Sequence, residues 1–416
     1  MAYGGAMTHH DGIAPSSASE RYDLVDALRG FALCGVLLAN LSAFSLYGYL
    51  AQPAQAALPS AEFDRIAQHA LEWLLTHKAV TVFSILFGFG FAMQLERAET
   101  RGGDGLRVFV RRMAVLLALG LIHSAFWWGD ILLVYALAGF ALVLCRKWPD
   151  RWLIWGGFAI ALAGTAAARG WLVSVSRAGP LSRQEVMTQA LQTLSEPSLS
   201  SAFAGNAELL RWWYPLGGLM LVLFALGRFM LGYWAGRRRL LQDPAAQLPL
   251  LKRILAWTLP LGLLTTALQF WQRPVHEALP LLNKGFGVHV WMALVTFSGP
   301  LLLGIAVATI FVLLYLRAGW QRWLRHLAPV GRMALSNYLM QTVVCSAIFY
   351  GYGLGIGPGY GTAAWFIVWA LLFPAQMVLS RWWLARFRFG PMEWLWRTLT
   401  YGRLQPMRPR AVLAQR

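Results

Sequence analysis

The segment HSAFWWGD places a histidine and an aspartate, His123 and Asp130, seven residues apart. Gly129 and Asp130 favour a turn, so a tight hairpin here would bring the imidazole and the carboxylate together. A carboxylate beside an imidazole fixes its tautomer and raises its basicity, which suits general-base catalysis. The alternative is a structural His–Asp hydrogen bond that closes the hairpin. We take His123 and Asp130 as the candidate catalytic pair and keep both interpretations open.

A second polar group lies in RYDLVDALRGFALCGVLLANL, which contains Asp26, Arg29 and Asn40. Arg29 and Asn40 are eleven residues apart, and at about 100° per residue this spacing returns to the same helix face. Asp26 lies one turn earlier, near that face. Polar side chains in a membrane are costly unless they have partners or line a cavity. The pattern predicts a polar path into the membrane; the alternative is an interfacial ion pair plus an asparagine that holds helices together.

Three further polar residues lie in apolar stretches. Arg228, in LVLFALGRFMLGYW, either extends to the cytoplasmic surface or points into the bundle. In the second case it would bind an acid or a phosphate, for which arginine is well suited. Asn337 and Gln341 are four residues apart, so they share one helix face. That face predicts either hydrogen bonds between helices or the wall of a cavity.

These residues lie in a chain of 416 residues that is 58% apolar and 13% charged. The charged share is about half that of a soluble domain, so lipid is the expected solvent. A span needs about 20 apolar residues, and ten stretches qualify: 28–50, 70–95, 110–128, 130–146, 152–173, 212–236, 252–272, 287–316, 331–350 and 362–384. The third and fourth form one run, which we divide at 127–130. The sequence therefore predicts an all-α polytopic membrane protein with about ten transmembrane helices.

Basic residues alternate between the connections of these spans. They gather after the second, fourth, sixth and eighth spans and in the C-terminal segment, whereas the other connections contain few. This pattern predicts that both termini face the cytoplasm, and it explains the net charge of +18 without nucleic-acid binding. We therefore expect a disordered cytoplasmic tail over 1–27, a transmembrane domain over 28–384 and a basic cytoplasmic tail over 385–416. The longest outer connection is about 174–211.

The cysteines and histidines do not indicate a metal or haem. Cys34, Cys145 and Cys345 are far apart in sequence, and no CxxC pair or HExxH motif is present. A b-type haem would need two histidines deep in the membrane on separate helices, and only His123 is placed in this way. We predict no metal cofactor.

The segments RYDLVDALRGFALCGVLLANL, VFSILFGFGFAMQLERA, HSAFWWGDILLVYALAG, GRMALSNYLMQTVV with the following FYGYGLG, and FGPMEWLWRTLTYG resemble the YeiB-like bacterial membrane proteins. They occur in that family's order and cover nearly the whole chain. The family is a domain of unknown function. The first segment is also similar to the transmembrane acyltransferase superfamily, whose members include the lysosomal heparan enzyme. That resemblance implies that Asp26, Arg29 and Asn40 lie on an acyl-CoA path and that a membrane-embedded histidine is catalytic.

The position of the histidine differs from the wider superfamily. In the heparan enzyme it lies between the first two spans, where this chain has His69 or His77. His123 belongs to the YeiB-like pattern itself, so we prefer it.

We expect a transmembrane acyltransferase that moves an acyl group, such as acetyl, from cytoplasmic acyl-CoA to a hydroxyl or amine acceptor outside. The acceptor would be a small molecule or a glycan, and the protein would lie among the lipids of the bacterial inner membrane. The phosphates of acyl-CoA would bind basic residues at the cytoplasmic face, and the candidates are Arg29, Arg228, Arg332 and Arg397. A cavity along Asn40, Asn337 and Gln341 would join that face to the outer face. The alternatives are a transporter or lipid flippase and a non-catalytic membrane scaffold.

Overall fold

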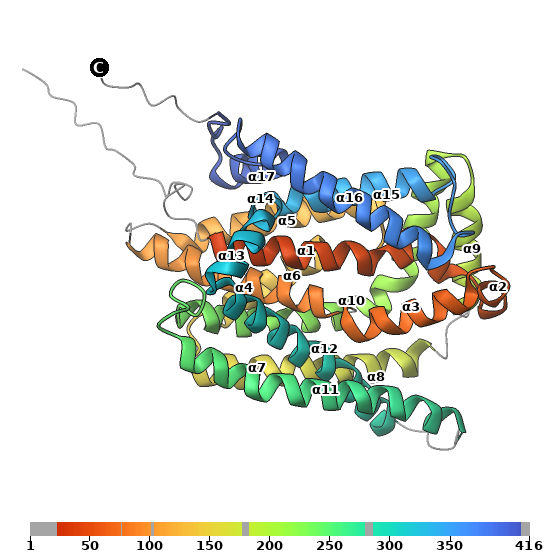
Figure 1. Ribbon diagram of the computed structural model, residues 1–416, viewed down its shortest axis with the longest axis horizontal. Coiled ribbons are helices and arrows are strands. Elements are labelled where there is room, and N and C mark those ends of the chain that lie inside the picture. The colour runs from red at the N-terminus through yellow and green to blue at the C-terminus, as the bar shows by residue number, and fades with distance from the viewer. Residues whose placement is uncertain (1–22, 76, 101–103, 177–182, 279–285, 409–416) are drawn as a thin grey trace, which may run out of the picture.

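The computed structural model describes residues 23–75, 77–100, 104–176, 183–278 and 286–408, and these contain helices but no strand. The helices that run along the bundle (Figure 1) are α1 (Asp23–Phe44), α4 (Lys78–Thr100), α5 (Gly105–Phe126), α6 (Leu132–Leu144), α7 (Asp150–Ala159) continuing through a π-helical turn (Ile160–Gly164) into α8 (Thr165–Ser176), α10 (Leu199–Arg237), α11 (Leu248–Ala278), α12 (Phe286–Tyr315), α15 (Ala334–Phe349) and α16 (Gly361–Leu384). The shorter helices are a 3-10 turn (Tyr47–Tyr49), α2 (Gln52–Ala56), α3 (Ala61–Leu74), α9 (Arg183–Ser195), α13 (Ala318–Leu324), a second 3-10 turn (Arg325–Leu327), α14 (Ala328–Arg332) and α17 (Pro391–Tyr401).

The structure confirms a polytopic helical membrane protein. Seven helical segments in the described part of the chain are long and apolar enough to cross a membrane, and α6 and α15 are shorter apolar helices. Each of the ten predicted stretches contains a helix. The predicted break at 127–130 is also present, because α5 ends at Phe126 and α6 begins at Leu132. The two helices form a hairpin.

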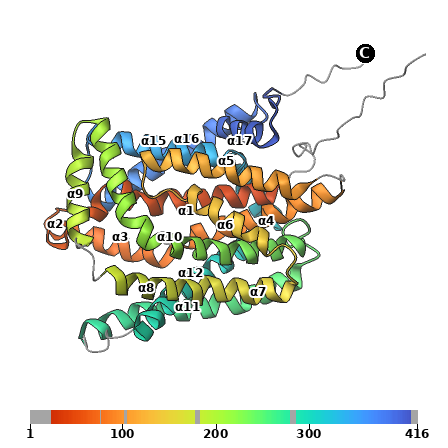
Figure 2. The ribbon, with the colours of Figure 1, turned by 180° about the vertical axis from the view of Figure 1, so that it is seen from behind.

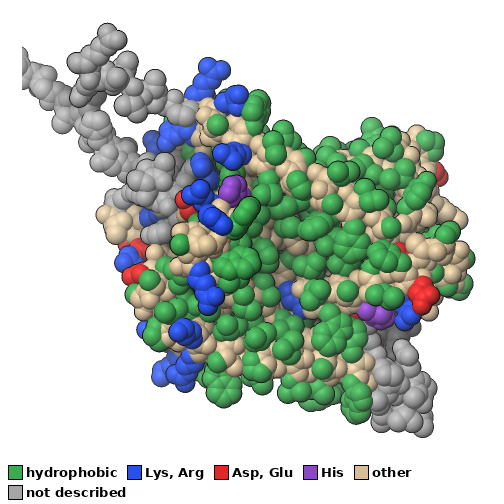
Figure 3. All heavy atoms as spheres, viewed as in Figure 1, with side chains coloured by type: hydrophobic (Ala, Val, Ile, Leu, Met, Phe, Trp, Pro, Cys, Tyr) green, Lys and Arg blue, Asp and Glu red, His purple; other side chains and the backbone are tan. Residues whose placement is uncertain are grey.

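Basic side chains gather at one end of the bundle, which we call the basic end. Figure 3 shows Lys and Arg at the end where α13 and α17 lie, whereas hydrophobic side chains cover most of the remaining visible face. Ion pairs join three helix ends there: Arg238 contacts Asp150 at 2.7 Å, and Arg239 contacts Glu96. Since cytoplasmic connections carry an excess of basic residues, this end is expected to face the cytoplasm.

The termini and the longest outer connection contain helices, and a short helix in that connection agrees with its sequence. Helix α1 begins at Asp23, inside the predicted tail 1–27, whose residues 1–22 lie outside the described residues. The outer connection over 174–211 contains α9 and the first turns of α10, which begins after the N-cap Ser198. The C-terminal segment contains α17, packed on α5 and α15 rather than extending from the bundle (Figure 2). Residues 409–416 of the predicted C-terminal tail lie outside the described residues.

Helices α4 and α10 form the centre of the bundle and approach each other through glycines. A Cβ atom at Gly88 would overlap the carbonyl oxygen of Phe229, and one at Gly232 would overlap the carbonyl oxygen of Ile85. Small residues allow helix backbones to touch in a membrane, where van der Waals packing drives helix association.

We expect Gly232→Ala to lower the free energy of unfolding by about 1–3 kcal/mol, because the added methyl group pushes α10 away from α4. The measurement is the thermal transition of the detergent-purified protein. Gly319→Ala in α13 is the matched control, since a methyl group added at Gly319 would have no neighbouring atom within 4 Å. An unchanged transition in Gly232→Ala would contradict the direct contact between the two backbones.

Candidate functional site

The α5–α6 hairpin brings His123 and Asp130 together, as the sequence predicted. His123 Nδ1 lies 2.7 Å from Asp130 Oδ1, and both residues are buried, with 5% and 3% of their surface exposed. Gly120 lets the hairpin close, because a Cβ there would meet the backbone of Leu133. The second carboxylate oxygen of Asp130 accepts a hydrogen bond from the Leu133 amide at 2.8 Å. Asp130 therefore starts α6 and holds the imidazole at the same time.

The other nitrogen of His123 also has a partner. His123 Nε2 lies 2.9 Å from the hydroxyl oxygen of Thr342 on α15, which is 1% exposed. A carboxylate only accepts hydrogen bonds, so the proton of a neutral imidazole lies on Nδ1 and Nε2 accepts from the threonine. Thr342, His123 and Asp130 thus form one buried chain of hydrogen bonds. Thr342 is not among the site residues predicted from the sequence.

Aromatic side chains surround the chain of hydrogen bonds and fix its position. The ring centroids of Tyr338 and Trp127 lie 5.3 and 6.2 Å from that of His123. The Tyr338 hydroxyl accepts a hydrogen bond from the Ile131 amide at 3.3 Å, and Tyr214 donates to the carbonyl oxygen of Asp130 at 3.3 Å. The connection around Asp130 is therefore held by contacts from both α15 and α10.

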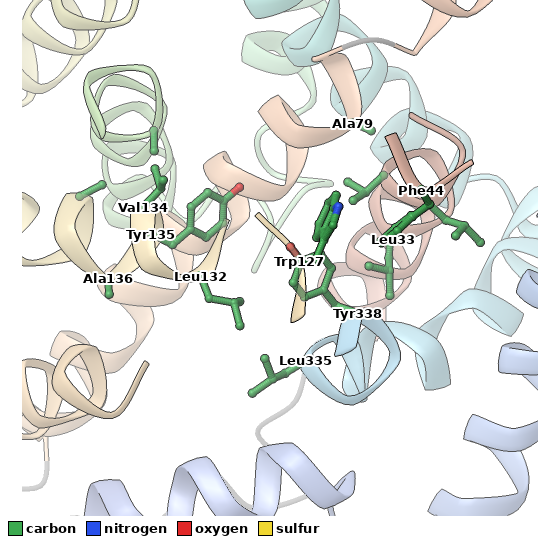
Figure 4. Close-up of a cluster of buried hydrophobic side chains, with 14 of the residues drawn as sticks. Leu33, Phe44, Ala79, Trp127, Leu132, Val134, Tyr135, Ala136, Leu335 and Tyr338 are labelled. Atoms are coloured by element: carbon green, nitrogen blue, oxygen red, sulfur yellow. The ribbon is translucent and has the colours of Figure 1, made fainter. Parts of the chain in front are cut away.

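A cavity of about 360 Å³ extends from the basic end toward these residues. Its inner wall contains Gly129, Ile131 and Tyr338, which adjoin Asp130 and His123, and Asn40 also lines it. Figure 4 shows part of the lining, with Tyr135 on one side and Tyr338 on the other. The middle of the cavity is apolar, lined among others by Leu33, Val36, Val80, Phe83, Leu86, Phe87 and Leu132. His123, Asp130 and Thr342 lie behind this wall and do not line the cavity.

Arginines dominate the cavity at the basic end, where its lining includes Arg29, Arg97, Arg112, Arg332, Arg388 and Arg397. The acidic residues in the lining are Asp26, which pairs with Arg29 at 3.0 Å, and Glu393. Six guanidinium groups therefore face two carboxylates. Such a surplus concentrates anions, and arginine binds phosphate through two hydrogen bonds at once.

Two polar groups in this lining lack a partner. Gln94 Nε2 and Arg332 Nε are both buried and make no hydrogen bond within the described part of the chain. A buried donor without a partner costs free energy, about 1–3 kcal/mol, and is an exception in folded proteins. A ligand that carries hydrogen-bond acceptors would satisfy both donors. Gln94 was not among the predicted site residues.

Arg228 lies outside the cavity lining. Its Nε donates to Thr81 Oγ1 at 2.8 Å and its NH1 group to the Phe224 carbonyl at 2.9 Å, and its guanidinium stacks on the Phe224 ring. The side chain is fully buried between α4 and α10, and no acidic side chain among the described residues pairs with it. Arg228 is therefore not one of the arginines that line the cavity.

Asn337 and Gln341 also lie outside the cavity lining, on the side of α15 that faces α16. Gln341 donates to Gln376 at 2.9 Å, Gln376 donates to the Asn337 carbonyl at 2.9 Å, and Asn337 donates to Ser380 at 2.9 Å. These bonds link two helices, as polar side chains often do within membranes. The neighbouring face of the same helix carries Tyr338 and Thr342.

The two alternative histidines are not part of the cavity. The His69 ring packs near Phe270 and the His77 ring near Phe224. Neither lines the cavity that ends near His123. Across the residues that the structure describes, no group of three or more His, Cys, Asp or Glu is arranged to hold a metal ion.

The fold and the site define a polytopic helical membrane protein with an arginine-lined cavity whose inner wall lies in front of a buried His–Asp pair. Residues 235–403 match the family model described as "Protein of unknown function (DUF418)". The chain is 32% identical to the "Uncharacterized protein YxaH" of Bacillus subtilis (strain 168), over 95% of this chain and 98% of that protein. It is 29% identical to the "Uncharacterized protein YeiB" of Escherichia coli (strain K12), over 92% of this chain and 96% of that protein. The chain belongs to this YeiB-like family, and no solved structure matches it.

Proposed function

We propose that the chain is a membrane acyltransferase that moves an acyl group from cytoplasmic acyl-CoA to a hydroxyl or amine acceptor at the outer face. One observation carries the proposal: a single cavity joins the arginines at the basic end to the wall in front of His123. Because acyl-CoA is made in the cytoplasm, the proposed location is the bacterial inner membrane.

The lining of the cavity matches the parts of an acyl-CoA in order. The arginines and the unpartnered donors of Gln94 and Arg332 suit the phosphates and the polar nucleotide. The apolar middle suits the pantetheine arm and the acyl chain. On α1 the lining runs from Val25 to Asn40, about 23 Å at 1.5 Å per residue, which is close to the length of an extended pantetheine arm. The thioester would then lie near Tyr338.

In this proposal His123 supplies the base and Asp130 orients it. The Asp130 carboxylate keeps the proton on Nδ1, so that Nε2 can accept a proton from a hydroxyl or amine. Asp26, Arg29 and Asn40 line the cavity, and in this proposal they lie along the bound acyl-CoA. Arg228, Asn337 and Gln341 do not bind the donor in this proposal, because they do not line the cavity.

Binding of acetyl-CoA to the detergent-purified protein tests the proposal. We expect saturable binding that weakens roughly ten- to a hundredfold in Arg332→Ala, because a charge-assisted hydrogen bond contributes about 1.5–3 kcal/mol. Binding should also weaken with rising salt.

Arg322→Ala is the matched control, since Arg322 is exposed on α13 at the same end and does not line the cavity. It should bind acetyl-CoA as the wild type does. If the folded wild-type protein binds neither acetyl-CoA nor a long-chain acyl-CoA, the proposal is wrong, and transport assays become the next experiment.

A further inference from the structure

Thr342 occupies the position of a nucleophile in a three-residue hydrogen-bond chain. We propose that its hydroxyl accepts the acyl group and carries it as an O-acyl-threonine between the cytoplasmic donor and the outer acceptor. This inference rests on the proposed acyltransferase function and adds a covalent intermediate to it. The reaction would then proceed in two half-reactions.

The direction of the hydrogen bonds supports the assignment. Asp130 Oδ2 accepts a hydrogen bond from the Leu133 amide at 2.8 Å, and Asp130 Oδ1 lies 2.7 Å from His123 Nδ1. The carboxylate is therefore the hydrogen-bond acceptor in both contacts. The lone pair of His123 Nε2 therefore points at the Thr342 hydroxyl, 2.9 Å away. A hydroxyl that donates to a base, itself oriented by a third group, is the arrangement of an activated nucleophile.

The same contact argues against direct attack by an outside acceptor on the resting site. The Thr342 hydroxyl is hydrogen-bonded to His123 Nε2. Nε2 is the only ring nitrogen of His123 that can accept a proton, because Nδ1 is bonded to Asp130. An acceptor would have to displace the threonine before it could lose its proton to His123. If Thr342 itself takes the acyl group, its proton moves to Nε2 without such a displacement.

Thr342 lies next to the inner end of the cavity. It follows Tyr338 by four residues on α15, so the two side chains are one helical turn apart on neighbouring parts of one face. Tyr338 lines the cavity and separates it from His123. A turn of the Tyr338 ring would let a thioester reach Thr342. The Tyr338 hydroxyl only accepts in its contact with the Ile131 amide, so once the ring has turned its own proton can bind the thioester carbonyl oxygen.

The two half-reactions balance without any further reactant. In the first, the Thr342 oxygen bonds to the thioester carbon, its proton passes to His123 Nε2, the carbon–sulfur bond breaks, and the leaving thiolate takes that proton. In the second, an acceptor hydroxyl or amine gives its proton to Nε2 and bonds to the acyl carbon. The bond from that carbon to the threonine oxygen breaks, and the oxygen takes the proton back.

The test uses the full-length, detergent-purified protein with acetyl-CoA carrying a labelled acetyl group and without acceptor. We expect release of about one equivalent of free coenzyme A thiol per protein in a fast phase, followed by slow hydrolysis. Peptide mass spectrometry should find the acetyl group on Thr342. Thr342→Val and His123→Ala should lose both the fast phase and the label, whereas Thr342→Ser should retain them.

Thr309→Val is the matched control, because Thr309 is a buried threonine that bonds only to its own helix at Ile305. Binding of acetyl-CoA, measured in the same samples, separates the two proposals. If the wild type binds and turns over acetyl-CoA but the label lies on His123 or nowhere, or Thr342→Val turns over normally, Thr342 is not the carrier and the acyltransferase proposal survives. If the wild type does not bind acyl-CoA, both proposals fail. Should Thr342→Val not fold, the position of the label in the wild type and in Thr342→Ser still decides.

Discussion

The Asp130→Asn variant is expected to lose roughly 10³- to 10⁴-fold in the rate of acetyl-CoA turnover, the scale seen when a triad carboxylate is replaced by an amide. The Leu133 amide must still find an acceptor, so the side-chain oxygen of asparagine turns toward it and the NH2 group faces His123. That NH2 group donates to Nδ1 and moves the imidazole proton to Nε2. Nε2 then no longer accepts the proton of Thr342. Turnover by the purified variant measures the effect.

Two controls separate this loss from a loss of fold. Asp130→Asn keeps the acceptor that starts α6, so its thermal transition and its affinity for acetyl-CoA should remain close to those of the wild type. In a His123→Ala background, Asp130→Asn should lower the turnover rate little further, because the effects of residues that act as one unit are not additive. A variant that turns over acetyl-CoA at the wild-type rate would show that the His123–Asp130 bond only closes the hairpin.

The part of the site that the sequence predicted is local. His123 lies seven residues before Asp130, which is itself part of the Gly-Asp turn, so the turn alone brings the two together. Asp26, Arg29 and Asn40 share one face of α1, and that face lines the cavity. In both cases the spacing along the chain determines the arrangement, and no knowledge of how distant helices pack is needed.

The part that the sequence did not predict depends on packing between distant helices. Asn337 and Gln341 were predicted as site residues because polar side chains are costly in lipid. In the structure their side chains instead form hydrogen bonds with Ser380 and Gln376 on α16. Thr342 gave no such signal, because a threonine in a membrane helix can bond to a carbonyl of its own helix, as Thr309 does. Only the contact with His123, 219 residues away in sequence, distinguishes it.

The basic C-terminal segment was predicted as a tail, yet it forms α17. Pro391 occupies the first turn of α17, where proline is favoured. Trp396 packs under the guanidinium of Arg112 at 4.0 Å and donates to the Arg112 carbonyl at 3.0 Å. The distribution of basic residues predicted that this segment faces the cytoplasm, but it does not indicate which helices the segment packs against. As a result, the residues that α17 contributes to the cavity were only partly anticipated, through Arg397.

Glu393 on α17 caps the first turn of α15, the helix that carries Tyr338 and Thr342. Its Oε1 accepts from the amides of Leu335 and Ser336 at 2.7 and 3.0 Å, and its Oε2 accepts from the Ser336 hydroxyl at 2.6 Å. The N-cap residue of α15, Met333, supplies no side-chain acceptor. The free amides at the start of α15 therefore depend on a carboxylate that lies 57 to 58 residues further along the chain.

We expect Glu393→Ala to lower the free energy of unfolding by about 2–4 kcal/mol, because two buried amides lose a charged acceptor. Acetyl-CoA binding should weaken in the same variant, since Glu393 and Arg397 line the cavity and α17 would no longer be held against α15. The measurements are the thermal transition and acetyl-CoA affinity in detergent. A transition equal to that of the wild type would show that α17 does not stabilise α15.

Glu393→Gln is the matched variant, because its amide oxygen can still accept from the start of α15. Burial raises the pKa of Glu393 above its ordinary value of 4.5, although hydrogen bonds from Ser336 and Leu335 oppose the shift. A group whose pKa is raised by folding stabilises the protein below its ordinary pKa, and this contribution is lost as the pH rises through the raised value. The wild-type transition should therefore fall by more than that of Glu393→Gln as the pH is raised above 4.5. Equal pH profiles would mean that folding does not raise the pKa of Glu393, because the hydrogen bonds would then offset the effect of burial.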